Sequence, residues 1–222
     1  MNSIRFPKAL GVVFGFLLLP LSWGQVPWSE MQELVGEERG SGDQFGADLA
    51  LRGDLLVVGA PSGWNEAGNR TGVVHLFNAR RGEWLGLLAP PDGEPGDRFG
   101  ASLAMAGSLV AVGAPGAAGP NGKANQGKVH LFAADSLELE RTLEIPPDGG
   151  DEGAGFGEEL HYDSGRLYVL SRTFQDTPSA RVYEWDPVSG QLLTTYTPTG
   201  TGGGFSIFPS SFAVAGERVL IG

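Results

Sequence analysis

The sequence has no cysteine among its 222 residues, and this absence removes several classes of protein. A disulfide scaffold, a thiolate zinc site, a cysteine nucleophile and a Cys-linked lipoprotein anchor are all excluded. Basic residues are also scarce, because 15 Lys and Arg stand against 26 Asp and Glu, a formal net charge of −11. Since so acidic a chain repels phosphate backbones, we expect no nucleic acid among its partners.

Long hydrophobic runs are missing except near the N-terminus. Residues 1–8 carry Arg5 and Lys8 and no acid, and residues 9–21 are apolar apart from glycine and Pro20. These 13 residues are fewer than the roughly 20 that span a bilayer. The pattern predicts a signal peptide at residues 1–24, cleaved after Gly24, and a secreted or extracytoplasmic protein without a membrane span. The rest keeps 13 basic and 26 acidic residues, a net charge of −13.

Glycine and proline are abundant, with 36 Gly and 15 Pro. No segment after residue 24 has a convincing helical period of apolar residues. This composition is typical of a protein made of many short strands and tight turns. The hydrophobic content of 41% is enough for a core, so an all-β fold is expected and disorder is not.

A repeat of about 54 residues dominates the chain. Phe45 and Gly46 recur as Phe99 and Gly100, and the Gly-Ala-Pro motif at residues 59–61 recurs at 113–115. A third copy opens at residue 156 and a fourth at residue 208. In the third copy we infer a one-residue insertion near position 165, which aligns Gly-Ala-Pro with residues 171–173.

Each repeat contains four strand-like runs, joined by glycine-containing turns. In the first copy we predict strands at residues 47–51, 55–59, 73–77 and 84–89. The third and fourth runs recur at 129–132 and 139–145, and again at 182–185 and 192–197. Four antiparallel strands at this period predict a β-propeller blade, and a β-solenoid is the alternative. Residues 25–41 precede the first repeat and are predicted to supply an outer strand that closes a blade.

The paired Phe-Gly and Gly-Ala-Pro motifs resemble the FG-GAP repeats of the integrin α-subunit propeller, and most of all the exported bacterial arrays of such repeats. The resemblance covers residues 42–222, about three and a third repeats. It implies a β-propeller of four-stranded antiparallel blades, and an incomplete ring of the usual seven. It also points to an array without calcium loops. The turns between the first two strands, such as residues 51–55, offer too few oxygens for the six to eight ligands of calcium. We therefore expect no metal and no cofactor.

Three features weigh against catalysis. No Gly-x-Ser-x-Gly elbow occurs, and the glycine-rich segments match neither a phosphate loop nor a dinucleotide fingerprint. His75 and His130 occupy the same repeat position, where the third copy has Tyr183. Interchangeable rings indicate a packing position rather than a metal or acid–base site. The sequence predicts no catalytic residue, and we expect that the chain is not an enzyme.

The loops that follow Gly-Ala-Pro differ between copies while the strands keep their register, so we expect them to contact partners. The candidate contact residues are Trp64, Asn65 and Phe174. Asp48 and Glu159 share a position on the Phe-Gly strand, which lies innermost in the family. They are candidates for lining the central channel, either as a weak polar site or as a solvated wall.

Two short motifs have simple interpretations. Residues 52–54 read Arg-Gly-Asp, but the copies read Ala-Gly-Ser and Ala-Gly-Glu, so only the turn glycine is required. Asn69 opens a formal glycosylation sequon in a predicted loop.

The sequence favours an exported or cell-surface recognition or adhesion module that binds protein or glycan partners through its blade loops. An accessory propeller of a larger extracellular hydrolase, with its catalytic site outside this chain, is one alternative. A purely structural envelope protein is another. If the chain is complete, self-association is also expected, because fewer than four repeats cannot close the family's ring.

Overall fold

The computed structural model describes residues 34, 42–120, 122–147, 153–173, 179–197, 211–216 and 218–221. The chain divides into the units Met1–Gln32 and Glu33–Gly222, and every described residue belongs to the second unit. The predicted signal peptide of residues 1–24 lies outside the described residues. So does the predicted closing strand of residues 25–41, apart from Leu34.

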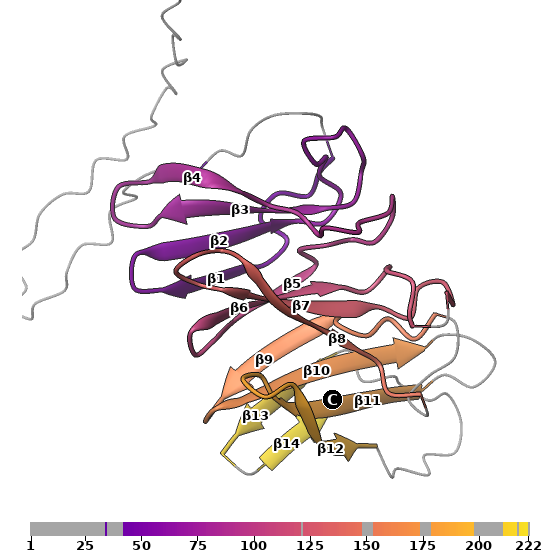
Figure 1. The fold of residues 1–222 in the computed structure, drawn as a ribbon. Helices are drawn as coiled ribbons and strands as arrows, with labels where there is room; N and C mark the ends of the chain where they lie inside the picture. The colour runs from indigo at the N-terminus through magenta and orange to yellow at the C-terminus, as the bar shows by residue number, and fades with distance from the viewer. Residues whose placement is uncertain are drawn as a thin grey trace, which may run out of the picture. The chain divides into compact units, whose positions relative to one another are not determined.

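Three four-stranded antiparallel sheets follow one another along the chain, each with its strands in sequence order (Figure 1). The first blade contains β1 (Leu49–Arg52), β2 (Leu55–Ala60), β3 (Val73–Asn78) and β4 (Glu83–Leu88). The second contains β5 (Ser102–Ala106), β6 (Leu109–Ala114), β7 (Lys128–Ala133) and β8 (Leu139–Glu144). The third contains β9 (Glu159–Asp163), β10 (Arg166–Thr173), β11 (Ser179–Asp186) and β12 (Gln191–Tyr196). The described part of the fourth consists of β13 (Phe212–Ala215) and β14 (Arg218–Ile221).

These sheets confirm the predicted all-β, four-stranded blades, and the predicted strand ends in the first three repeats differ from the observed ones by three residues at most. The described residues include no helix, and therefore none long and apolar enough to cross a membrane.

The predicted insertion in the third repeat is wrong. Ser102 pairs with Gly113 in the second blade, and the equivalent Glu159 pairs with Leu170 in the third. The hairpin between the first two strands has two turn residues in all three blades. Gly-Ala-Pro is therefore replaced by residues 170–172, not 171–173. The physical reason is the pleat, because a one-residue slip would turn every following side chain to the opposite face of the sheet.

Close backbone contacts between blades explain why the two motifs contain glycine. A Cβ on Gly59 would lie 2.1 Å from the carbonyl oxygen of Gly100, and a Cβ on Gly113 would lie 2.1 Å from that of Gly157. Gly100 and Gly157 themselves have positive φ angles of 87° and 89°. The glycine of Gly-Ala-Pro in one blade thus packs directly on the Phe-Gly glycine of the next, where no side chain fits.

The phenylalanine of each Phe-Gly motif packs within its own blade. Phe99 is fully buried and meets His130 and Phe132 of β7 edge-on, at ring distances of 5.5 and 6.0 Å. Phe156 meets Tyr183 and Trp185 of β11 in the same way, at 5.6 and 6.3 Å. Edge-to-face contacts of this kind stabilise a core beyond the area that they bury.

Hydrophobic clusters join consecutive blades. One combines Val57, Val74 and Leu76 of the first blade with Leu103 and Val110 of the second, among others. A second joins the second and third blades, and a smaller one joins β10 and β11 to β13 and β14. Each sheet therefore buries one face against the next blade along the chain.

Candidate functional site

The loop between β2 and β3 carries two of the three residues predicted to contact a partner. The side chain of Trp64 is 42% exposed. The backbone N–H of Asn65 donates to the carbonyl oxygen of Asn69 at 2.9 Å, and the Asn65 Oδ1 atom accepts from the Asn69 N–H at 2.9 Å. The third predicted contact, Phe174, lies outside the described residues.

Further hydrogen bonds anchor both ends of this loop. The Arg70 Nε atom donates to the carbonyl oxygen of Ser62 at 2.9 Å, and its Nη2 atom donates to that of Gly42 at 3.0 Å. The N–H of Gly72 donates to the carbonyl oxygen of Gly63 at 3.1 Å. A loop held in this way loses little conformational entropy on binding, which favours recognition.

A cavity of about 290 Å³ opens beside the loop. It is lined by Asn65, Glu66, Ala67, Val73, Leu87 and Ala89. The Glu66 side chain is exposed and forms no hydrogen bond or ion pair with any residue that the structure describes. The cavity thus combines an aliphatic wall with one available carboxylate, and it lies at the small end of the range for ligand sites.

Asp48, a predicted channel residue, binds the next blade. Its Oδ2 atom accepts a hydrogen bond of 2.7 Å from the backbone N–H of Leu103 on β5. Ser102 holds the same position in the second blade, and its Oγ atom donates to the carbonyl oxygen of Gly157 at 2.7 Å. Side chains at this position therefore link one blade to the next.

Glu159, the other predicted channel residue, repeats the contact of Asp48. Its carboxylate accepts a hydrogen bond from the backbone N–H of Phe212, which is equivalent to Leu103. Partial burial raises the pKa of Glu159 despite this hydrogen bond. A channel-lining role for the two carboxylates stays a prediction, since the contacts observed are with neighbouring blades.

The histidine position of the repeat is a buried ring site, as the sequence predicts. His75 and His130 are 2% and 1% exposed, and Tyr183 at the same position is 1% exposed. Burial lowers the pKa of His130 to about 4. Its Nδ1 atom lies 3.2 Å from the Thr142 hydroxyl oxygen. Because His130 is neutral at physiological pH, it acts there as a packing ring.

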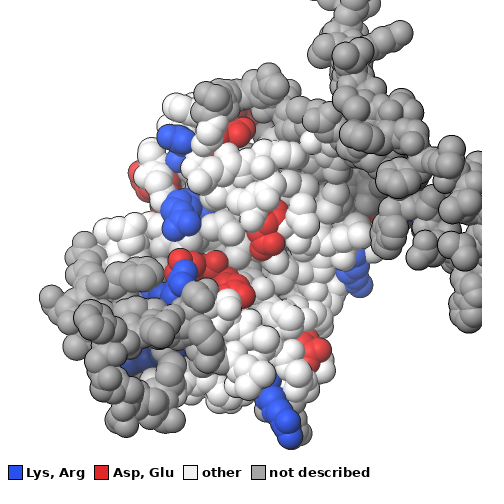
Figure 2. Space-filling view, turned by 180° about the vertical axis from the view of Figure 1, so that it is seen from behind, with Lys and Arg blue, Asp and Glu red and all other residues white. Residues whose placement is uncertain are grey.

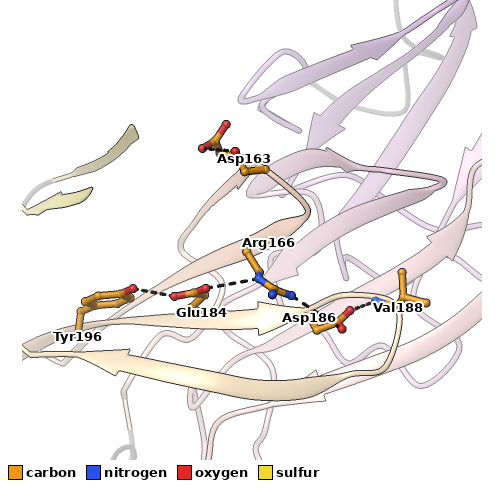
Figure 3. Close-up of polar contacts among 7 residues, drawn as sticks. Asp163, Arg166, Glu184, Asp186, Val188 and Tyr196 are labelled. Carbon is orange, nitrogen blue, oxygen red and sulfur yellow. Dashed lines mark hydrogen bonds and ion pairs between the residues drawn. The ribbon is translucent and has the colours of Figure 1, made fainter. Parts of the chain in front are cut away.

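The third blade contains a polar network that the sequence analysis missed (Figure 3). The Tyr196 hydroxyl donates to the Glu184 Oε2 atom at 2.7 Å. The Arg166 Nε atom is 3.7 Å from the Glu184 Oε1 atom, and the Arg166 Nη1 atom is 3.9 Å from the Asp186 Oδ2 atom. The pKa of Tyr196 is raised to about 12, first by the hydrogen bond to Glu184 and second by burial.

This network replaces leucines of the other blades. The strand register makes Arg166, Glu184 and Tyr196 equivalent to Leu109, Leu131 and Leu143 of the second blade, and to Leu55, Leu76 and Leu88 of the first. Leu131 and Leu143 belong to the core between the second and third blades. The third blade therefore turns a more polar surface toward its successor. The alignment of residues 182–185 with 129–132 already matches Glu184 to Leu131, and the erroneous insertion displaced only Arg166.

The Arg-Gly-Asp tripeptide forms the β1–β2 hairpin turn and is engaged in contacts within the chain. The Arg52 Nη1 atom donates to the carbonyl oxygen of Gly107 in the next blade. Asp54 pairs with Arg80 at 2.5 Å. These contacts engage both charged residues within the chain, although neither residue recurs in the second copy, which reads Ala-Gly-Ser.

The glycosylation sequon lies at the base of the first-blade loop. Asn69 is exposed and Thr71 is fully buried, where the Thr71 hydroxyl donates to the carbonyl oxygen of Gly72 at 2.9 Å. The hydroxyl residue of the sequon therefore contributes to the fold.

In the described part of the chain, no group of three or more His, Asp or Glu side chains is arranged to hold a metal ion. Charged side chains on the face in Figure 2 form separate small groups among other residues, and Lys and Arg form no continuous band there. A basic band is what a phosphate backbone requires.

The repeats match a known family. The FG-GAP repeat family matches residues 28–77 and 86–132. The chain carries FG-GAP repeats in these two segments. It is also similar to human integrin alpha-D, with 32% identity over 123 residues, which cover 47% of this chain and 10% of the integrin. The resemblance inferred from the motifs is confirmed, and the match spans about a tenth of the integrin's length.

Solved structures similar to this FG-GAP chain include the RRP9 WD40 repeats, with a TM-score of 0.47, 14% identity, and coverage of 74% of this chain and 41% of that one. Sqt1 of Saccharomyces cerevisiae gives a TM-score of 0.43 at 15% identity, over 67% of this chain and 34% of that one. The chain thus spans less than half of either structure. The blade architecture rests on the FG-GAP chain's own sheets and repeats.

Proposed function

We propose that this FG-GAP repeat chain is an exported, non-catalytic recognition or adhesion module that binds a protein or glycan partner at the cell surface through its blade loops. The observation that carries the proposal is Trp64, a large apolar side chain held 42% exposed on a loop with an anchored backbone. Tryptophan is enriched among the residues that dominate binding energy. Trp64 is therefore the residue of this loop that we expect to contribute most to partner binding.

Export is part of the proposal. The N-terminal pattern of residues 1–24 supports it, and FG-GAP repeats are typical of extracellular proteins. The mature protein is expected to begin at Gln25, which N-terminal sequencing of the exported form would show.

The binding function is tested with two unbiased libraries. The full chain is immobilised, selected against phage-displayed random peptides, and probed on a glycan array. We expect specific hits from one library, and we expect Trp64→Ala to weaken their binding at least about tenfold, as for a typical hot-spot residue. Trp84→Ala is the matched control, because Trp84 is 44% exposed on β4, away from the loop.

Two results would overturn the proposal. One is the absence of any reproducible peptide or glycan hit, which a purely structural role predicts. The other is a set of hits whose affinity falls equally in the Trp64→Ala and Trp84→Ala variants, since nothing would then connect binding to the loop.

A further inference from the structure

In the second blade a lysine stands at the strand position of Val73, one of the residues that line the first-blade cavity. Val73 pairs with Ala60 in the first blade, and Lys128 pairs with Ala114 in the second, so Val73 and Lys128 are equivalent. The Lys128 side chain is only 17% exposed, and its Nζ atom lies 3.0 Å from the Asp92 Oδ2 atom. The blade scaffold therefore accommodates an aliphatic stem and an ammonium group at this position.

The first blade keeps the space but lacks the lysine. The Val73 side chain is shorter than that of Lys128 by several atoms. On the neighbouring strand, Leu87 and Ala89 of the first blade replace Thr142 and Glu144 of the second. All three first-blade residues line the cavity. Their aliphatic surfaces suit methylene groups, which gain free energy when they leave water.

A carboxylate is available at the same cavity. Glu66 lines it, is exposed, and is bonded to none of the residues that the structure describes. The nearby cation Arg70 already donates to the backbone carbonyls of Ser62 and Gly42. Glu66 is therefore positioned to pair with a cation that comes from outside the chain.

We propose that the first-blade cavity binds a lysine side chain of a protein partner, with the methylenes against Val73, Leu87 and Ala89 and the ammonium group at Glu66. This inference rests on the proposed function, because it names the group that the loop would recognise. The net charge of −11 would also attract a basic partner. Lys128 of the second blade pairs with Asp92 of the β4–β5 connection within one chain, and at the first-blade cavity a lysine–carboxylate pair would form between two molecules.

Small probes test the cavity without an identified partner. Nα-acetyl-lysine methylamide is titrated into the ¹⁵N-labelled full chain and compared with Nα-acetyl-norleucine methylamide, which has an aliphatic chain without the ammonium group. We expect chemical-shift changes at the amides of residues 65–67 and 73 with the lysine probe, and a dissociation constant lower by about fivefold or more than for norleucine. Methyl glucoside is the third probe and represents a glycan partner.

Two variants and a control identify the site. Glu66→Gln is expected to reduce the affinity for the lysine probe to that for norleucine, whereas Glu138→Gln, at an exposed glutamate of the second blade, leaves it unchanged. Val73→Lys places a lysine in the cavity from within, as Lys128 does, and is expected to abolish the shifts. An unchanged spectrum elsewhere shows that this variant remains folded.

The outcomes are distinct. Equal binding of lysine and norleucine probes, binding of the glucoside alone, or no shift at residues 65–67 would each overturn the lysine site. If Trp64-dependent hits from the libraries persist in any of these cases, the recognition function stands and only its assignment to lysine fails. Lysine-specific shifts that survive Glu66→Gln would equally overturn the assignment.

Discussion

Glycine residues carry the backbone contacts between blades, at positions where a side chain has no room. Gly113 is one such case, because its φ angle is unexceptional and a Cβ there would lie 2.1 Å from the carbonyl oxygen of Gly157 in the next blade and 2.3 Å from the Ser102 Oγ atom. The requirement for glycine is thus a property of the interface and not of the local turn. At this position the third blade has Leu170, which packs with Phe212.

Gly113→Ala is expected to lower the free energy of unfolding by about 3 kcal/mol, since a Cβ only 2.1 Å from an oxygen must push two blades apart. Gly53→Ala is the control. A Cβ at Gly53 would meet no atom within 4 Å, and the φ angle there is 58°. The Gly53→Ala variant is therefore expected to lose only about 1 kcal/mol, from the strain of that backbone conformation. Urea unfolding of the two variants and the parent measures the difference, and equal losses would contradict the interface explanation.

His130 predicts a pH dependence of stability. Burial lowers its folded-state pKa from 6.5 to about 4, so below pH 6.5 the unfolded chain binds a proton that the folded chain does not. Stability is therefore complete above about pH 6.5 and falls as the pH drops towards 4, by about 3 kcal/mol from this residue. Unfolding curves across this range should show the decline.

Substitution separates His130 from other acid effects. His130→Tyr introduces the ring that the third blade has at this position, and the variant is expected to show a shallower decline between pH 6.5 and pH 4. His161→Tyr replaces a partly exposed histidine with the same residue and is the control for the substitution itself. Parallel curves for the parent and His130→Tyr would show that His130 does not control the transition.

At the scale of the element, the third blade differs from the other two at equivalent positions. Arg166, Glu184 and Tyr196 form a polar network where the first and second blades have leucine. The Glu184 side chain is only 14% exposed, so the loss of its partners would lower the stability of the folded protein. When one partner of a buried pair is removed, the remaining polar group stays buried without a hydrogen bond. The loss of folding free energy is then larger than the net contribution of the intact pair.

Glu184→Leu is expected to reduce the free energy of unfolding by about 1–2 kcal/mol, because the Tyr196 hydroxyl and the Arg166 guanidinium lose their carboxylate. It should also lower the pKa of Tyr196 from about 12 towards 10, since the hydrogen bond to Glu184 is the first cause of the increase. Urea unfolding and an ultraviolet titration of tyrosine provide the two measurements.

The matched control is the triple variant Arg166→Leu, Glu184→Leu and Tyr196→Leu, which restores the leucine pattern of the other blades. Replacement of buried ionic partners together by apolar residues is often neutral or stabilising, and Asp186 keeps its hydrogen bonds from the N–H groups of Val188 and Ser189, so most of the lost stability should return. A triple variant less stable than Glu184→Leu alone would show that the third blade needs its polar surface.

At the scale of the whole molecule, the first blade presents an apolar surface that the other blades bury. Leu49 and Leu51 on β1 are 61% and 59% exposed. Leu103 of the second blade is equivalent to Leu49, is 5% exposed, and packs in the core against the first blade. The equivalent Leu160 in the third blade is 8% exposed. An exposed patch of this kind promotes association.

The 222-residue chain expressed alone is therefore expected to self-associate with increasing concentration. The double variant Leu49→Ser and Leu51→Ser should shift the sedimentation profile towards the monomer. Leu85→Ser is the control, because Leu85 is 51% exposed on β4, at the other edge of the sheet. A parent that stays monomeric at every concentration would contradict the prediction.

The sequence alone determined the repeats, the strands and their antiparallel order, because periodic motifs and two-residue turns are local signals. It also identified the histidine position as a packing site, since rings alternate there between copies. Only the tertiary structure decided the contacts between blades. The links from Asp48 and Glu159 to the next blade and the polar network of the third blade depend on which faces meet. The first-blade cavity depends on the tertiary structure as well, because side chains from a loop and two strands are brought together only when the sheet forms.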